Sequence, residues 1–153
     1  MDINFNVLGL EELQRKIEAI KSLETNIEID KALGRGAARM QGQVKYLTPT
    51  GELGGTGYLK NSIFLDHQKM MEYAIETNVE YSLYVEFGTG ALGDPSVPHT
   101  SKESWVYFSE ALQHFVTTHG QKPAAMFRQG FEIMKDIVVV IVNREVEEII
   151  RNA

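Results

Sequence analysis

Residues 123–150 read PAAMFRQGFEIMKDIVVVIVNREVEEII, with apolar side chains recurring mostly every three or four positions from Phe127 to Ile149. The central run 137–142 is wholly apolar and would by itself suit a buried strand, but the length of the pattern and its flanking charges predict a helix. Pro123 fits the first position of that helix. Because residues 137–142 are apolar nearly all round, the helix must be covered on several sides, which favours an oligomer or a central helix.

The first fifty residues predict one strand and two helices. Alternation of apolar and polar residues over 3–7 predicts a short strand, and helical spacing predicts a helix over 10–23. A second helix, capped by Thr25 or Asn26, is expected to run to about Tyr46, before Pro49. Its apolar stripe is Ile29, Leu33, Ala37, Met40, Val44 and Leu47.

The middle of the chain predicts two strand pairs separated by a short helix. The pairs are 62–66 with 71–79 and 105–108 with 113–118, and the helix over 80–87 is stopped by Gly88. Segments rich in glycine and proline predict flexible loops at about 48–60 and 88–104. The chain is therefore expected to be a single domain, residues 1–153, of the α+β class.

Composition removes several classes of protein. The 153 residues include no cysteine, which excludes disulfide scaffolds, cysteine zinc sites, iron–sulfur clusters and thiol nucleophiles. The net charge is −6, and residues 48–87 hold six acidic residues against two basic ones, which argues against tight binding along a nucleic-acid backbone. The longest apolar run is too short to span a membrane and the start lacks a basic signal region, so a soluble intracellular product is expected.

No motif points strongly to chemistry. Residues 88–93, GTGALG, match the GxGxxG pattern, but no strand precedes them and no helix can begin normally across 94–98. A flexible or interface loop is the expected reading, with a small ligand-binding protein as an alternative. We expect no catalytic residue, no metal site and no cofactor, because phosphate-loop, HExxH and GxSxG patterns do not fit.

Two other patterns suggest binding surfaces. Lys31, Arg35 and Arg39 recur every four residues and form one basic line, which is either a solvated face or a docking surface for an acidic neighbour. Aromatic residues are concentrated in the second half, in a greater number than one small core needs, and aromatic side chains are enriched at interface anchors.

Four segments together resemble a known family: Thr48-Pro49, TGYLKNSI at 56–63, YSLYVEFGTG at 81–90 and GQKPAAMF at 120–127. In this order they resemble the neck or tail-completion proteins of long-tailed bacteriophages, the minor head–tail joining family, over about residues 30–150. The chain departs from the family pattern at 124–125 and in a longer insert over 92–119.

The resemblance implies a small twisted antiparallel sheet packed against helices, with a long C-terminal helix. It also implies a structural virion protein without catalysis, assembled in the host cytoplasm, that forms a ring of about six copies around the DNA channel. Its expected partners are copies of itself, head-completion proteins, and the tail terminator or tail tube. DNA would pass through without specific binding, and no membrane is involved. A tail terminator that caps the tube and a host-encoded adaptor domain remain alternatives.

The expected interface residues come from the loops and the short helix, with Tyr58 and Phe87 as anchors. The full set is Tyr58, Leu59, Tyr84, Glu86, Phe87, Gly88, Thr89 and Gly90, together with the basic line. Glu72, Glu76 and Glu80 are expected to face the lumen, with Glu86 beside them, where their negative charge would keep DNA from adhering.

Overall fold

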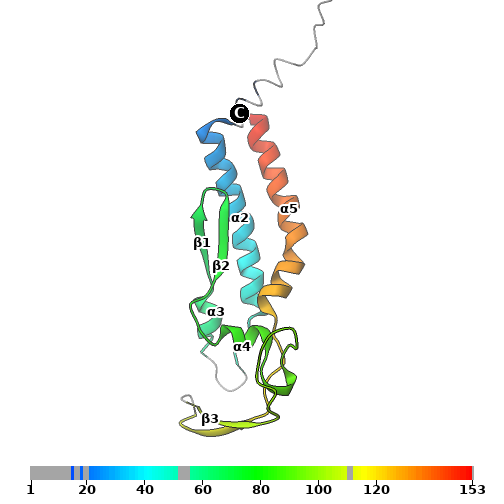
Figure 1. Ribbon diagram of the computed structural model, residues 1–153. Helices are drawn as coiled ribbons and strands as arrows, with labels where there is room; N and C mark the ends of the chain where they lie inside the picture. The colour runs from blue at the N-terminus through cyan, green and yellow to red at the C-terminus, as the bar shows by residue number, and fades with distance from the viewer. Residues whose placement is uncertain (1–14, 16–17, 19–20, 52–55, 110–111, 153) are drawn as a thin grey trace, which may run out of the picture.

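The computed structural model describes residues 15, 18, 21–51, 56–109 and 112–152. Its frame is an antiparallel pair of long helices, α2 (Leu23–Leu47) and α5 (Met126–Asn152), which lie side by side along the length of the molecule (Figure 1). The predicted strand at 3–7 and most of the predicted helix at 10–23 lie outside the described residues. Among those residues, no helix is both long and apolar enough to cross a membrane.

Helix α2 begins earlier than its sequence pattern predicts. Ser22 is the N-cap, and its side chain accepts a hydrogen bond from the Thr25 backbone N–H at 3.1 Å. Thr25 and Asn26, the predicted caps, lie inside the first turns, so that prediction is wrong. The helix ends at Leu47, just before Pro49, where it was expected to end.

The two long helices approach closely at glycines. A Cβ on Gly36 would lie 2.7 Å from Val142 Cγ2, and a Cβ on Gly130 would lie 2.7 Å from Val44 Cγ2. Ala32 is fully buried on the same helix as Gly36. The predicted stripe of large aliphatic residues on α2 is half-buried apart from Val44, because small residues occupy the closest contact with α5.

The hydrophobic core gathers at the end of the molecule where α2 finishes and α5 begins. There the short helix α3 (Tyr58–Ser62) lies beside the end of α2, and α4 (Ser82–Phe87) runs across the ends of the helix pair. The buried core residues are Val44, Leu59, Ile63, Val79 and Met126.

The strands β1 (Phe64–Lys69) and β2 (Glu72–Glu76) form an antiparallel hairpin alongside α2. Asp30 of α2 holds it: one carboxylate oxygen accepts the Met71 N–H at 2.6 Å, and the other lies 3.2 Å from both the Tyr73 hydroxyl and His67 Nε2. The hairpin was predicted, but residue 62 belongs to a helix and the second strand stops at Glu76.

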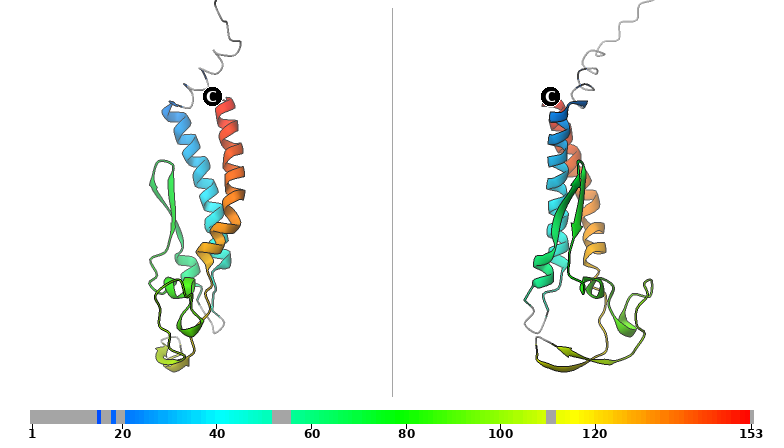
Figure 2. Two further views of the ribbon diagram at one scale, coloured as in Figure 1. Left: turned by 45° about the vertical axis from the view of Figure 1, so that its right-hand side comes forward. Right: turned by 60° about the vertical axis from the view of Figure 1, so that its left-hand side comes forward.

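The strands β3 (Trp105–Ser109) and β4 (His114–Thr118) form a second antiparallel hairpin, here called the arm, in agreement with the predicted pair. Figure 2 shows the arm set beyond the end of the long helices, away from the first hairpin. The two hairpins are separate sheets. The α+β class with a long C-terminal helix is confirmed.

Helix α5 starts at Met126, three residues after the predicted first position, Pro123. Ala125 has φ 49°, outside the helical region, and the N–H groups of Ala124 and Ala125 donate to the carbonyls of Val85 and Glu86 at 2.8 and 3.1 Å. The chain before α5 is therefore held by α4 and cannot join the helix.

Candidate assembly surfaces

Glu86 of α4 caps the N-terminus of α5. Its side chain is buried, and its two oxygens accept the backbone N–H groups of Phe127 at 2.9 Å and Arg128 at 3.2 Å. The first N–H groups of a helix have no partner within it and form the positive end of its dipole, so a carboxylate satisfies both needs. Glu86 is thus a structural residue of the subunit and is not exposed to a lumen or to a neighbour.

Arg128 extends this cap into a network. Its Nε donates to Glu86 at 3.1 Å, its Nη1 donates to Asp94 at 2.6 Å, and its guanidinium lies 4.8 Å from the centre of the Phe87 ring. The hydroxyl and backbone N–H of Ser96, followed by Arg128, hold the pKa of Asp94 well below its usual range. The carboxylate therefore stays charged, and the network joins α4, the turn at 94–96 and α5.

Residues 88–90 and 120–121, here called the stalk, connect this network to the arm. Thr89 and Gln121 exchange backbone hydrogen bonds at 2.9 and 3.2 Å. Gly88 has φ 74°, and a Cβ there would lie 2.5 Å from the Gln121 carbonyl oxygen. Gly90 lies against the Trp105 ring, which would be 2.8 Å from its Cβ. The two glycines allow the chain to approach the returning strand and the arm.

The geometry of residues 88–93 does not favour phosphate binding. A short 3-10 turn, η1 (Gly90–Leu92), follows Gly88 in place of an α-helix. The N–H groups of Thr89, Gly93 and Asp94 donate to Gln121, Gly90 and Phe87 carbonyls, so they are not directed at a ligand. Within the described parts of the chain, no three His, Asp or Glu side chains form a group that could hold a metal ion.

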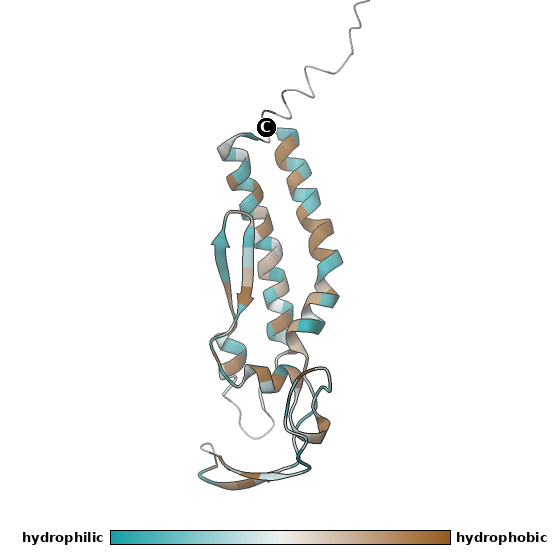
Figure 3. Ribbon diagram, in the orientation of Figure 1, coloured by the Kyte–Doolittle hydropathy of each residue, from teal (hydrophilic) through white to brown (hydrophobic). Residues whose placement is uncertain are grey.

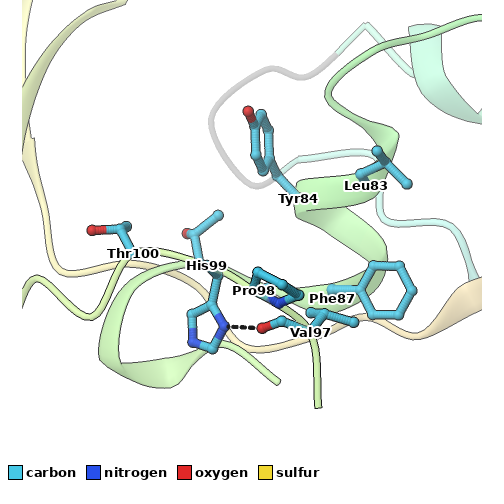
Figure 4. Close-up of a pocket in the computed structure, with 9 residues that line it drawn as sticks. Leu83, Tyr84, Phe87, Val97, Pro98, His99 and Thr100 are labelled. Carbon is cyan, nitrogen blue, oxygen red and sulfur yellow. Dashed lines mark hydrogen bonds between the residues drawn. The ribbon is translucent and has the colours of Figure 1, made fainter. Parts of the chain in front are cut away.

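A hollow of about 300 Å³ lies beside α4 (Figure 4). Leu83, Tyr84 and Phe87 line it from the helix, and Val97 and Pro98 line it from the loop. His99 Nδ1 lies 2.7 Å from the Val97 carbonyl oxygen, which holds this side of the loop in place. The hollow therefore presents a largely apolar wall.

The predicted interface residues separate into exposed and structural groups. Tyr58 and Tyr84 are 60% and 62% exposed, and Phe87 is half-buried at the edge of the hollow. Leu59 is in the core. Gly88 and Gly90 are buried in the stalk, where half-buried Thr89 also lies.

Most of the charged residues singled out in the sequence pair with other residues of the same subunit, and the others are exposed. Arg35 binds Glu145 of α5 at 2.6 Å, so it links the two long helices, whereas Lys31 pairs with Glu28 and Arg39 is exposed. Of the acidic residues, Glu72 pairs with Lys69, Glu76 accepts a hydrogen bond from Gln68 at 3.2 Å, and Glu80 is exposed.

Many of the exposed large apolar side chains belong to the arm and to α5, whose ribbons are partly brown, the colour of hydrophobic residues, in Figure 3. The arm exposes Val106, Tyr107, Phe108, Leu112 and Phe115, and α5 exposes Phe131, Ile133, Ile137, Val139 and Val140. The aromatic excess and the apolar run at 137–142 were the sequence signals for these surfaces. Sequence reasoning missed Arg128 and Asp94, for which the only local signal is the turn pattern Asp94-Pro95-Ser96.

Comparison with protein families places the chain among the tail proteins of bacteriophages. The family described as "Bacteriophage HK97-gp10, putative tail-component" matches residues 11–88, just over half of the chain. The chain belongs to this HK97-gp10-like family, as the resemblance implied, and is a component of the virion tail. No curated protein and no solved structure was found to match.

Proposed function

We propose that this tail component is a structural subunit of the neck, which joins or completes the tail at the head–tail interface by forming a ring around the DNA channel. The exposed apolar surface is the observation that carries the proposal. In the described part of the chain, the arm and α5 expose large apolar side chains, among them Val106 at 61%, Phe115 at 71% and Val140 at 69%. Neighbouring subunits would cover these side chains.

The arm gives a second reason for a neighbour. A two-stranded hairpin is at best marginally stable alone in water. The arm carries large exposed apolar side chains such as Tyr107 and Phe115, and the stalk joins it to the rest of the subunit. Contact with an adjacent copy would supply the missing packing.

The net charge of −6 fits a ring through which DNA moves. Repetition of an acidic subunit around a channel creates a negative wall, and like charge keeps the DNA backbone from adhering. Glu72, Glu76 and Glu80 are exposed and are the candidates for that wall, whereas Glu86 is buried against Arg128. Adjacent head-completion and tail tube proteins would stack on the two faces of the ring.

Removal of the gene from the phage that encodes the chain tests this role. Electron microscopy of the lysate is expected to show filled heads and tails of normal length that remain separate. Overlong tail tubes would instead identify a terminator that caps the tube. Normal, infectious particles would refute both roles.

A further inference from the structure

One exposed face of the arm is apolar except for Thr117. Val106, Phe108 and Phe115 share it, because alternate residues of a strand lie on one face and Phe108 is the direct partner of Phe115. The two phenylalanine rings meet edge to face with centroids 5.3 Å apart. These three side chains are 61%, 48% and 71% exposed. On the opposite face Trp105 is half-buried against Gly90, whereas Tyr107 is 47% exposed.

Helix α5 carries an apolar stripe of its own. Ile133, Ile137 and Val140 recur at intervals of four and three, so they lie on one face of the helix. They are 48%, 48% and 69% exposed. The contacts with α2 are made from other positions, among them Gly130, Val138 and Val142. The stripe is therefore a surface without a partner in the described subunit.

The arm face and the α5 stripe are similar in size and cannot meet within one subunit. With side chains of up to about 200 Å² that are roughly half to two-thirds exposed, each set presents about 300 Å². Val140 lies 14 residues beyond Met126, which is about 21 Å along the helix, whereas the arm lies beyond the other end of α5 (Figure 1). Each surface needs an occupant from outside.

We infer that the arm of one copy lies across the α5 stripe of the next copy, so that two different surfaces of the same chain cover each other. This inference rests on the proposed ring. A ring of more than two identical subunits needs a head-to-tail contact between two different surfaces, and this contact provides one. It would bury about 600 Å² of apolar surface, enough for the centre of an interface of standard size with a polar rim.

The absence of cysteine from the chain makes the contact testable by thiol cross-linking without background. The variant Phe115→Cys with Val140→Cys is treated with a short bis-maleimide, with and without isolated tail tubes, after circular dichroism has shown that it is folded. We expect a ladder of three or more linked subunits. Each single variant should stay unlinked, and a mixture of the two should give dimers only. Phe115→Cys with Tyr46→Cys is the matched control, since Tyr46 is 77% exposed and lies on α2 outside both surfaces.

Four results would overturn the inference. Efficient dimers of Phe115→Cys alone would mean that arm pairs with arm. A ladder of equal strength with Tyr46→Cys would mean that the linkage is unspecific. If the double variant gives no ladder while light scattering measures a ring-sized mass, the arm contact is wrong and the proposed ring stands. If no ladder forms and the mass stays that of a monomer under every condition, both fail.

Discussion

Replacement of Glu86 by glutamine tests the cap on α5. Glutamine keeps the size of the side chain but removes the charge, and its amide N–H₂ would face one of the donors that Glu86 now accepts. Glu86 accepts two backbone N–H groups and the Arg128 side chain. A hydrogen bond to a charged group contributes about 1.5–3 kcal/mol, and a favourable charge at a partly buried helix end contributes up to about 2 kcal/mol.

We expect Glu86→Gln to lower the free energy of unfolding by about 2 kcal/mol. The loss stays below the 3–5 kcal/mol that is typical when a buried ion pair is broken, because Arg128 is 45% exposed and keeps Asp94 as a partner. In a chain of this length the melting temperature would fall by roughly 4–8 °C. Amide hydrogen exchange at Phe127 and Arg128 should accelerate.

Urea titration followed by circular dichroism measures this difference. Glu80→Gln is the matched control, because Glu80 is exposed and a surface substitution of this kind changes stability by no more than about 0.5 kcal/mol. If Glu86→Gln is as stable as this control, the carboxylate does not stabilise the start of α5 and the network argument is refuted.

Three further predictions concern the network around Arg128, the contact between the two long helices and the hollow beside α4. The pKa of Asp94 is lower in the folded chain than in the unfolded chain, where it is about 4. Asp94 therefore stabilises the fold above the unfolded pKa, and this contribution is lost as the pH falls toward the folded pKa. Asp94→Asn should flatten the acid limb of a stability–pH profile, and an unchanged limb would contradict this. Gly36→Ala should destabilise the protein by about 1–3 kcal/mol through the clash with Val142, whereas Gly42→Ala, with no atom within 4 Å of its Cβ, should stabilise it by about 0.5–1 kcal/mol in the same urea titrations. Phe87→Ala should prevent the attachment of tails to heads in a complementation assay while circular dichroism stays that of a folded subunit; an unfolded variant would instead assign Phe87 to the core.

Local patterns predicted most of the elements. The period of apolar residues identified α2 and α5, both strand pairs were predicted, and Gly88 was correctly expected to stop α4. These features depend on neighbours in the chain, which is why a single sequence contains them. The start of α5 was misplaced because the N–H groups of Ala124 and Ala125 bond to α4, a contact between segments far apart in the chain.

The candidate site was less accessible to sequence reasoning. The family resemblance pointed to Tyr58 and Tyr84 as interface residues, and both side chains are exposed. Glu86 was identified by the same resemblance, but the sequence does not show that its carboxylate turns inward to cap a helix that begins forty residues later. Arg128 and Asp94 escaped notice because each looks like an ordinary surface charge until the fold brings the two together.

The amino-acid sequence alone established the α+β class, the absence of thiol chemistry, the acidic charge and the membership of a phage tail family. The class, the charge and the lack of thiols follow from composition and from patterns within short segments, and the family membership follows from the match over residues 11–88. The tertiary structure alone established that Gly36 and Gly130 form the closest contacts between the long helices and that the arm and α5 leave apolar faces uncovered. The physical reason is that burial is a property of surfaces that meet in space, and the same apolar residue is a core residue or a docking residue according to what the fold places against it.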